Sequence, residues 1–160
     1  MVTATVENGI MRRAGKKAPV TIEATEMRAE LESNTLAAII SGMHRDAFIL
    51  GDALDICPAS CFVTPEAAPL AEALHRLRVS GQKPCLTTLA VQMRDRAAKD
   101  ASRYTMPDMA RLAQLATSAW GLRGHVETLA RKLADEARRD ALRSGLLELA
   151  AESAVYGIEP

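Results

Sequence analysis

The sequence predicts an all-α fold, a compact bundle of about six helices ending in one long helix. The first reason is composition, because Ala, Leu and Met are abundant while aromatic residues make up only 3% of the chain. Ala, Leu and Met favour helices, whereas sheets are rich in Val, Ile, Tyr and Phe. The second reason is periodicity, because apolar residues recur three or four positions apart along most of the chain. With 160 residues and 48% hydrophobic content, the chain is long enough to bury one core.

We expect three parts: a flexible basic arm over residues 1–22, a helical domain over 23–156 and a short tail over 157–160. The simpler interpretation of the arm is a solvated, disordered segment, and the alternative is a contact with nucleic acid. The residues that would make that contact are Arg12, Arg13, Lys16 and Lys17.

The first helix is expected from Glu23, with Gly42 near its end. Its buried face has the i, i+3, i+4, i+7 spacing of Leu36, Ile39, Ile40 and Met43. A short second helix should run from about Asp46 to Ile56, until Pro58 interrupts the chain.

The third helix has the sharpest predicted start. Thr64 can cap it, Pro65 suits the first helical position and Glu66 suits the first turn. Leu70, Leu74 and Leu77 then form its apolar stripe, and the helix should stop at Ser80-Gly81.

Two further short helices are expected. One runs from Leu86 to about Ala98, and its inward residues are Leu86, Leu89, Ala90 and Met93. The other starts at Thr105, Pro107 and Asp108, which have capping-box spacing. Its apolar residues are Met109, Leu112, Leu115 and Ala116, and Trp120, Gly121 and Gly124 end it.

The last and longest helix is expected from His125 to about Tyr156. Its apolar residues Val126, Leu129, Leu133 and Ala137 lead on to Leu142, Leu146 and Leu149, with charged residues between them. At ~1.5 Å per residue it would be about 45 Å long. A globular domain of this size does not need such a length, so we expect part of it to project or to pack on a second chain.

The chain's cysteines raise the question of a metal or redox site. Cys57 and Cys61 stand in the sequence CPASC, with three residues between them. Possible further ligands are His44, His75 and Cys85, which lie on other segments. Structural zinc sites usually have four ligands at characteristic spacing, which this chain lacks. We therefore expect buried core residues and no metal or cofactor, with a metal site and a redox pair as the alternatives.

Catalytic motifs are missing from the sequence. It contains no phosphate-binding loop G-x-x-x-x-G-K-[ST], no H-E-x-x-H and no G-x-S-x-G, so we expect no enzymatic activity. The net charge is zero, which gives no overall attraction to nucleic acid or membrane. An odd number of cysteines without a secretory signal favours a cytoplasmic location, and no apolar run approaches ~20 residues.

One DNA-binding pattern competes with these expectations. The two short helices around Arg94–Arg111 loosely resemble a helix-turn-helix. Basic charge there comes from Arg94, Arg96, Lys99, Arg103 and Arg111. The connection is longer than the ~3–4 residues typical of that motif. A helical DNA-binding module that uses this region and the basic arm is our alternative function.

The order of helices resembles the N-terminal domain of bacterial replicative DNA helicases, the DnaB-like family. ELESNTLAAIIS (30–41) is similar to the opening helix of that family, and Phe62 stands where the family places an aromatic residue. The strongest match runs over residues 61–93, through the Ser80-Gly81 turn, Pro84 and the start at Leu86. MARLAQLA (109–116) and the long charged helix over 126–152 complete the match, which covers roughly residues 25–156.

The resemblance implies a non-catalytic protein-interaction domain of DNA replication. In the family this domain organises the helicase ring and docks primase or loader proteins. The implied partners are thus a replicative helicase, a primase or a helicase loader, with DNA contacted only weakly or indirectly and no membrane. Candidate partner-binding residues are Arg131, Arg138, Arg139 and Arg143, although a solvated charged face is the simpler interpretation.

The sequence departs from the family at several points. Ala67 and Ala68 replace a polar pair, Cys85 replaces an acidic residue, and Trp120 lies in a connection that is normally polar. The second helix of the family's dimerising hairpin and the ATPase domain do not follow, so we expect no ATP-driven unwinding from this polypeptide. Either the chain is a fragment or it is a stand-alone protein, and apolar patches without the hairpin partner could form a homodimer.

Overall fold

The computed structural model describes residues 18–43, 45–101, 108–118 and 124–156. These residues form six α-helices and one 3₁₀ turn, and the described part of the chain contains no strand. The elements are α1 (Ala18–Met43), α2 (Ala47–Ile56), the 3₁₀ turn η1 (Ala59–Cys61), α3 (Ala68–Val79), α4 (Leu86–Lys99), α5 (Met109–Ser118) and α6 (Val126–Tyr156). The predicted all-α bundle is confirmed.

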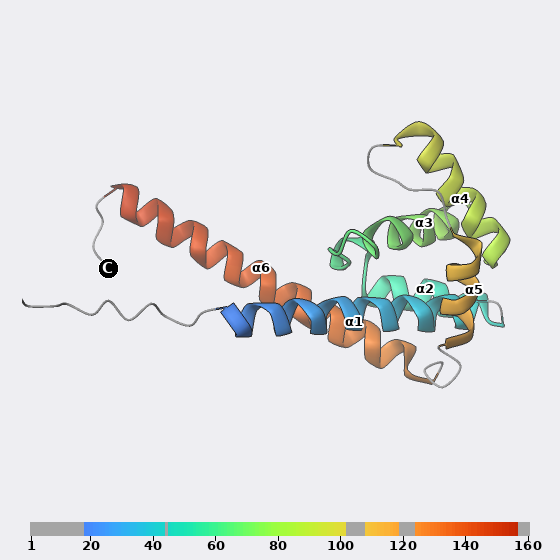
Figure 1. Ribbon diagram of the computed structural model, residues 1–160, viewed down its shortest axis with the longest axis horizontal. Helices are drawn as coiled ribbons and strands as arrows, with labels where there is room; N and C mark the ends of the chain where they lie inside the picture. Colours follow the sequence, from blue (N-terminus) through green and yellow to red (C-terminus); the bar gives the residue numbers. More distant parts are fainter. Residues whose placement is uncertain (1–17, 44, 102–107, 119–123, 157–160) are drawn as a thin grey trace, which may run out of the picture.

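Helix α1 occupies the centre of the bundle (Figure 1) and contacts α2, α5 and α6, while α3 and α4 pack on each other to one side. The predicted stripe of α1 is confirmed, because Leu36, Ile39, Ile40 and Met43 are all buried. Gly42 faces Ile49 of α2 so closely that a Cβ there would lie 3.0 Å from Ile49 Cγ2. The close approach of α1 and α2 thus depends on a residue without a side chain.

The predicted boundary between arm and domain was wrong. Helix α1 begins at Ala18, five residues before the expected start at Glu23. The stretch APVTIEATEMR contains a proline only at its second position, where a helix tolerates it. Residues 1–17 and 157–160 lie outside the described residues.

The predicted start of α3 was also wrong. The helix begins at Ala68 after Ala67, with a proline in its first turn, whereas Thr64, Pro65 and Glu66 lie in the preceding turn. No side chain caps the start of α3, and the Thr64 hydroxyl instead donates a hydrogen bond to Glu32 Oε2 at 2.6 Å. A carboxylate is a strong acceptor, so this bond turns the Thr64 side chain toward α1. The stripe of Leu70, Leu74 and Leu77 is buried as predicted.

Helices α4 and α5 start with side-chain caps. Cys85 precedes α4, where its sulfur accepts a bond from Thr88 N while Cys85 N donates to the Thr88 hydroxyl. Asp108 Oδ1 accepts bonds from Ala110 N and Arg111 N at the start of α5. Of the apolar residues expected in α5, Leu112 is buried, whereas Met109 is half exposed. The first residue of a helix has few neighbours to cover it, which explains the difference.

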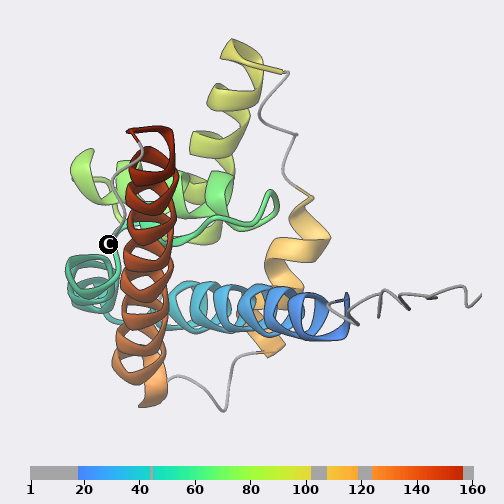
Figure 2. The same ribbon diagram turned by 90° about the vertical axis from the view of Figure 1, so that its left-hand side faces the viewer.

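Helix α6 is the longest element, and its 31 residues correspond to about 46 Å. Its first half packs on α1 and α2 and runs across α1 (Figure 2), while its second half extends beyond the other helices (Figure 1). The prediction that part of the last helix projects is confirmed. Among the described residues, no helix is both long and apolar enough to span a membrane.

Candidate interaction surface

The projecting half of α6 exposes several large apolar side chains. In the first half Val126, Ala130, Leu133 and Ala134 are buried in the core. From residue 141 to 154 every side chain is exposed apart from half-buried Gly145. Leu142, Leu146 and Leu149 are 70%, 67% and 61% exposed, and we call these three residues the leucine face.

Spacing explains why these leucines share one side of the helix. They are separated by four and three residues, so they align along a helix at 3.6 residues per turn. Leu147 is as exposed as its neighbour Leu146 but lies about 100° further around the helix, outside the leucine face. An exposed, aligned apolar stripe is typical of a surface that another protein covers.

The four arginines predicted to bind a partner flank or precede the leucine face. Arg131, Arg138, Arg139 and Arg143 are all exposed, and each forms an ion pair with an acidic residue three or four positions earlier in α6. The acidic partners are Glu127, Asp135, Glu136 and Asp140, in the same order. The exposure of these arginines is compatible with partner binding, but each arginine already has an acidic counter-charge within the helix. Partner binding by these residues stays a prediction.

A buried polar cluster fixes the point where α6 leaves the body. Arg28 of α1 donates to Glu32 at 2.9 Å and to the Cys61 carbonyl at 2.6 Å, and it reaches Asp140 of α6 at 3.4 Å. Fully buried Glu32 also accepts bonds from the backbone N–H groups of Val63 and Thr64. The cluster therefore joins α1, the turn after η1 and α6.

The environment of Glu32 favours its ionised form. Burial alone would raise the pKa of this carboxyl, but the bonds from Thr64, Arg28 and Val63 outweigh burial and hold the pKa below its ordinary value. Its acceptor positions are filled from several sides, so the carboxylate serves the fold and is not placed to act as a general base on a ligand.

The cysteines of the CPASC corner belong to the core, as predicted. Cys57 and Cys61 are buried and carry free thiols, and Phe62 beside them is buried as well. Burial, together with the neighbouring Cys61, raises the pKa of the Cys57 thiol far above its ordinary value. A thiol held in this form is a poor nucleophile and a poor metal ligand.

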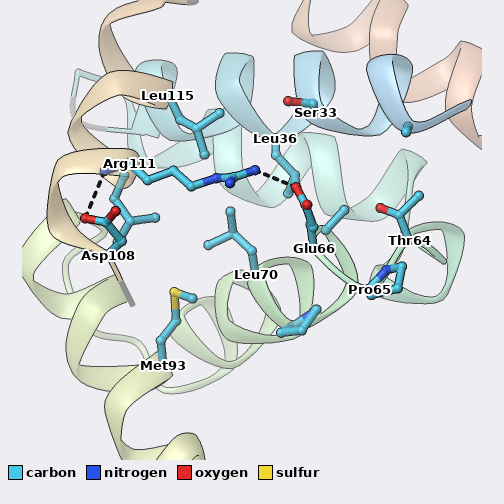
Figure 3. Close-up of a pocket in the computed structure, with 14 residues that line it drawn as sticks. Ser33, Leu36, Thr64, Pro65, Glu66, Leu70, Met93, Asp108, Arg111 and Leu115 are labelled. Atoms are coloured by element: carbon cyan, nitrogen blue, oxygen red, sulfur yellow. Dashed lines mark hydrogen bonds and ion pairs between the residues drawn. The ribbon is translucent and has the colours of Figure 1, made fainter. Parts of the chain in front are cut away.

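A groove of about 720 Å³ lies between α1, α3, α4 and α5 (Figure 3). Its apolar lining includes Leu36, Leu70, Met93, Leu112 and Leu115. At its mouth the Arg111 side chain extends to Glu66, with which it forms an ion pair, while Asp108 caps α5. The two carboxylates in the lining therefore already have partners within the chain.

Two arginines of the alternative DNA-binding site form ion pairs within the chain. Arg96 pairs with Glu72 and Arg111 pairs with Glu66, so two of these cations already face carboxylates. Arg103 and the arm residues Arg12, Arg13, Lys16 and Lys17 lie outside the described residues, as does His44. The DNA-binding alternative therefore stays a prediction.

No metal site emerges from the described residues. In that part of the chain no three His, Cys, Asp or Glu side chains are grouped so that they could hold a metal ion. His75, one of the candidate further ligands, is exposed on α3, and Cys85 lies at the start of α4, apart from the CPASC corner.

The chain matches no protein-family model, no curated protein and no solved structure. Its candidate site is therefore defined by its own geometry, and the resemblance to replicative helicases enters only as a hypothesis.

Sequence reasoning missed the leucine face as a site. It placed Leu142, Leu146 and Leu149 in line with the buried residues Val126 and Leu133 and treated them as one stripe. The available signal was length, because a core of this size covers only the first half of a helix of 31 residues.

Proposed function

We propose that this chain is a non-catalytic protein-interaction domain of DNA replication, whose partner is a replicative helicase, a primase or a helicase loader. The leucine face is the observation that carries the interaction part of this proposal. Covering apolar surface is favourable by about 25 cal/mol per Å². The three leucines gain this free energy only when another protein surface packs on them, because they are 61–70% exposed in the single chain.

The replication part of the proposal is supported by the resemblance to the helicase N-terminal domain, in which several similar segments follow one another in the same order. Residues that carry the resemblance also belong to the core, including Leu36, Leu77, Leu89 and Phe62. The chain would then supply a helical body and a projecting helix that organises or docks the partner, without chemistry of its own.

Co-elution tests the proposal. The full chain is mixed in turn with the purified helicase, primase and loader of the same host and passed over a size-exclusion column. We expect the chain to co-elute with at least one of them. Separate elution from all three proteins would contradict the proposed function.

A further inference from the structure

We infer that the leucine face docks on the same face of a second copy of this chain, with the two α6 helices antiparallel and crossing near Gly145. The inference rests on the proposed function in one respect, since it takes the leucine face as the interaction surface. A symmetric pair of this kind uses one patch twice, so every contact on one side is repeated on the other.

The spacing of the leucine face suits a second helix. Positions 142, 146 and 149 follow the alternating four- and three-residue steps of a coiled-coil seam. The seam lies on the exposed half of α6, which extends beyond the other described helices, so a second helix has access along its length (Figure 1).

The charges beside the seam select a second copy and fix its direction. Arg138, Gly145 and Glu152 are spaced seven residues apart and therefore line one edge of the seam. When two copies run antiparallel with Gly145 opposite its equivalent, Arg138 lies opposite Glu152 of the partner subunit, and the reverse pair repeats this contact. In a parallel pair this edge would face the other edge of the partner helix, so Arg138 would lie beside Arg143 of the partner subunit, a contact between like charges.

Gly145 is the residue that the single chain does not explain. Glycine is unfavourable in the interior of a helix. A Cβ at this position would meet nothing within 4 Å, so packing within the chain does not require its absence. At the crossing point of two helices, in contrast, a glycine allows the backbones to approach closely and lets the leucines on either side interlock.

Analytical ultracentrifugation of the full chain over a range of concentrations tests the inference. We expect a concentration-dependent dimer that Leu146→Glu weakens at least about tenfold, because the substitution places a charge in the seam. Leu147→Glu is the matched control, since the adjacent leucine is equally exposed but lies outside the seam. Far-UV circular dichroism verifies that both variants are folded.

Charge reversal tests the antiparallel arrangement. Arg138→Glu and Glu152→Arg should each weaken the dimer, and the double variant should restore it, because the opposite charges then face each other again. Glu148→Arg is the control for Glu152→Arg. Both glutamates are exposed on the second half of α6, but Glu148 lies outside the seam and its edges.

Three results would overturn the inference: a chain that stays monomeric, a dimer that tolerates Leu146→Glu, or single charge reversals that leave the dimer unchanged. A monomer that still co-elutes with a replication protein would refute the antiparallel pair alone. A dimer that binds none of those proteins would refute the replication function alone.

Discussion

At the scale of single residues, Glu32 contributes most to how the body is joined to its projecting helix. It is fully buried, yet it receives donors from Arg28, Val63 and Thr64. Because Arg28 also reaches Asp140, loss of the carboxylate would affect both the α3 start and the base of the α6 projection.

Glu32→Gln should therefore destabilise the fold. The glutamine side chain has the shape of glutamate, but its amide cannot accept all the hydrogen bonds that the carboxylate accepts. It also leaves the Arg28 guanidinium without its buried counter-charge. We expect a loss of about 3 kcal/mol in the free energy of unfolding, measured by urea denaturation at pH 7. Glu30→Gln is the matched control, because Glu30 is exposed on the same helix and should change stability by less than about 0.5 kcal/mol. Equal effects of the two substitutions would contradict this role of Glu32.

The same residue predicts a dependence of stability on pH. The pKa of Glu32 lies below its ordinary value of 4.5 in the folded protein, so folding favours the carboxylate. Its contribution is present above pH 4.5 and is lost as the pH falls through the lowered pKa. The stability difference between the wild type and Glu32→Gln should thus shrink below pH 4.5 and stay constant from pH 6 to 8. A difference that grows on acidification would contradict the sign.

The three thiols should differ in reactivity. The bond to the Thr88 side chain lowers the pKa of the half-buried Cys85 thiol, whereas burial raises the pKa of Cys57. We expect iodoacetamide at neutral pH to modify Cys85 first in the native protein and to reach Cys57 and Cys61 only after unfolding, as followed by mass spectrometry of peptides. Native-state labelling of Cys57 ahead of Cys85 would contradict this assignment.

At the scale of elements, the sequence was most informative where apolar spacing decided the structure. The buried faces of α1 and α3 follow directly from the spacing of Leu36, Ile39, Leu70 and Leu74. The start of α3 could not be read in the same way, because the preferred partner of Thr64 is a carboxylate 32 residues earlier in the chain. A local capping rule does not include such a distant acceptor.

Gly145→Ala distinguishes the stability of helix α6 from its packing at the dimer crossing. Alanine favours the helix by about 1 kcal/mol relative to glycine, and its Cβ has free space within the chain. Helix content should therefore be kept or raised, while the dimer should weaken about tenfold because the new methyl groups meet at the crossing. Circular dichroism and ultracentrifugation measure the two effects, with Ser144→Ala, outside the seam, as the control. A tighter dimer for Gly145→Ala would refute the close crossing.

At the scale of the whole molecule, the chain divides into a body and an assembly element. The core includes residues from Leu36 to Ala134, with Ala137 partly buried against it, whereas the leucine face begins five residues later. Sequence reasoning recognised that the last helix was too long for the body, but the point of departure became visible only with the contact between Arg28 and Asp140. That contact joins residues 112 positions apart, which no local pattern reveals.

This division predicts that the body folds without the projection. A chain ending after Asp140 keeps every core residue and the Arg28 contacts, and over residues 141–154 it loses only exposed side chains and half-buried Gly145. We expect its free energy of unfolding to stay within about 1 kcal/mol of a full-length Leu146→Glu monomer, since exposed residues contribute little to stability.

The same truncated chain should remain monomeric at concentrations where the full chain dimerises. Urea denaturation and ultracentrifugation of the two chains measure both properties. A truncated chain that unfolds, or that still dimerises, would show that the second half of α6 is not a separate assembly element, because stability and self-association would then depend on the same residues.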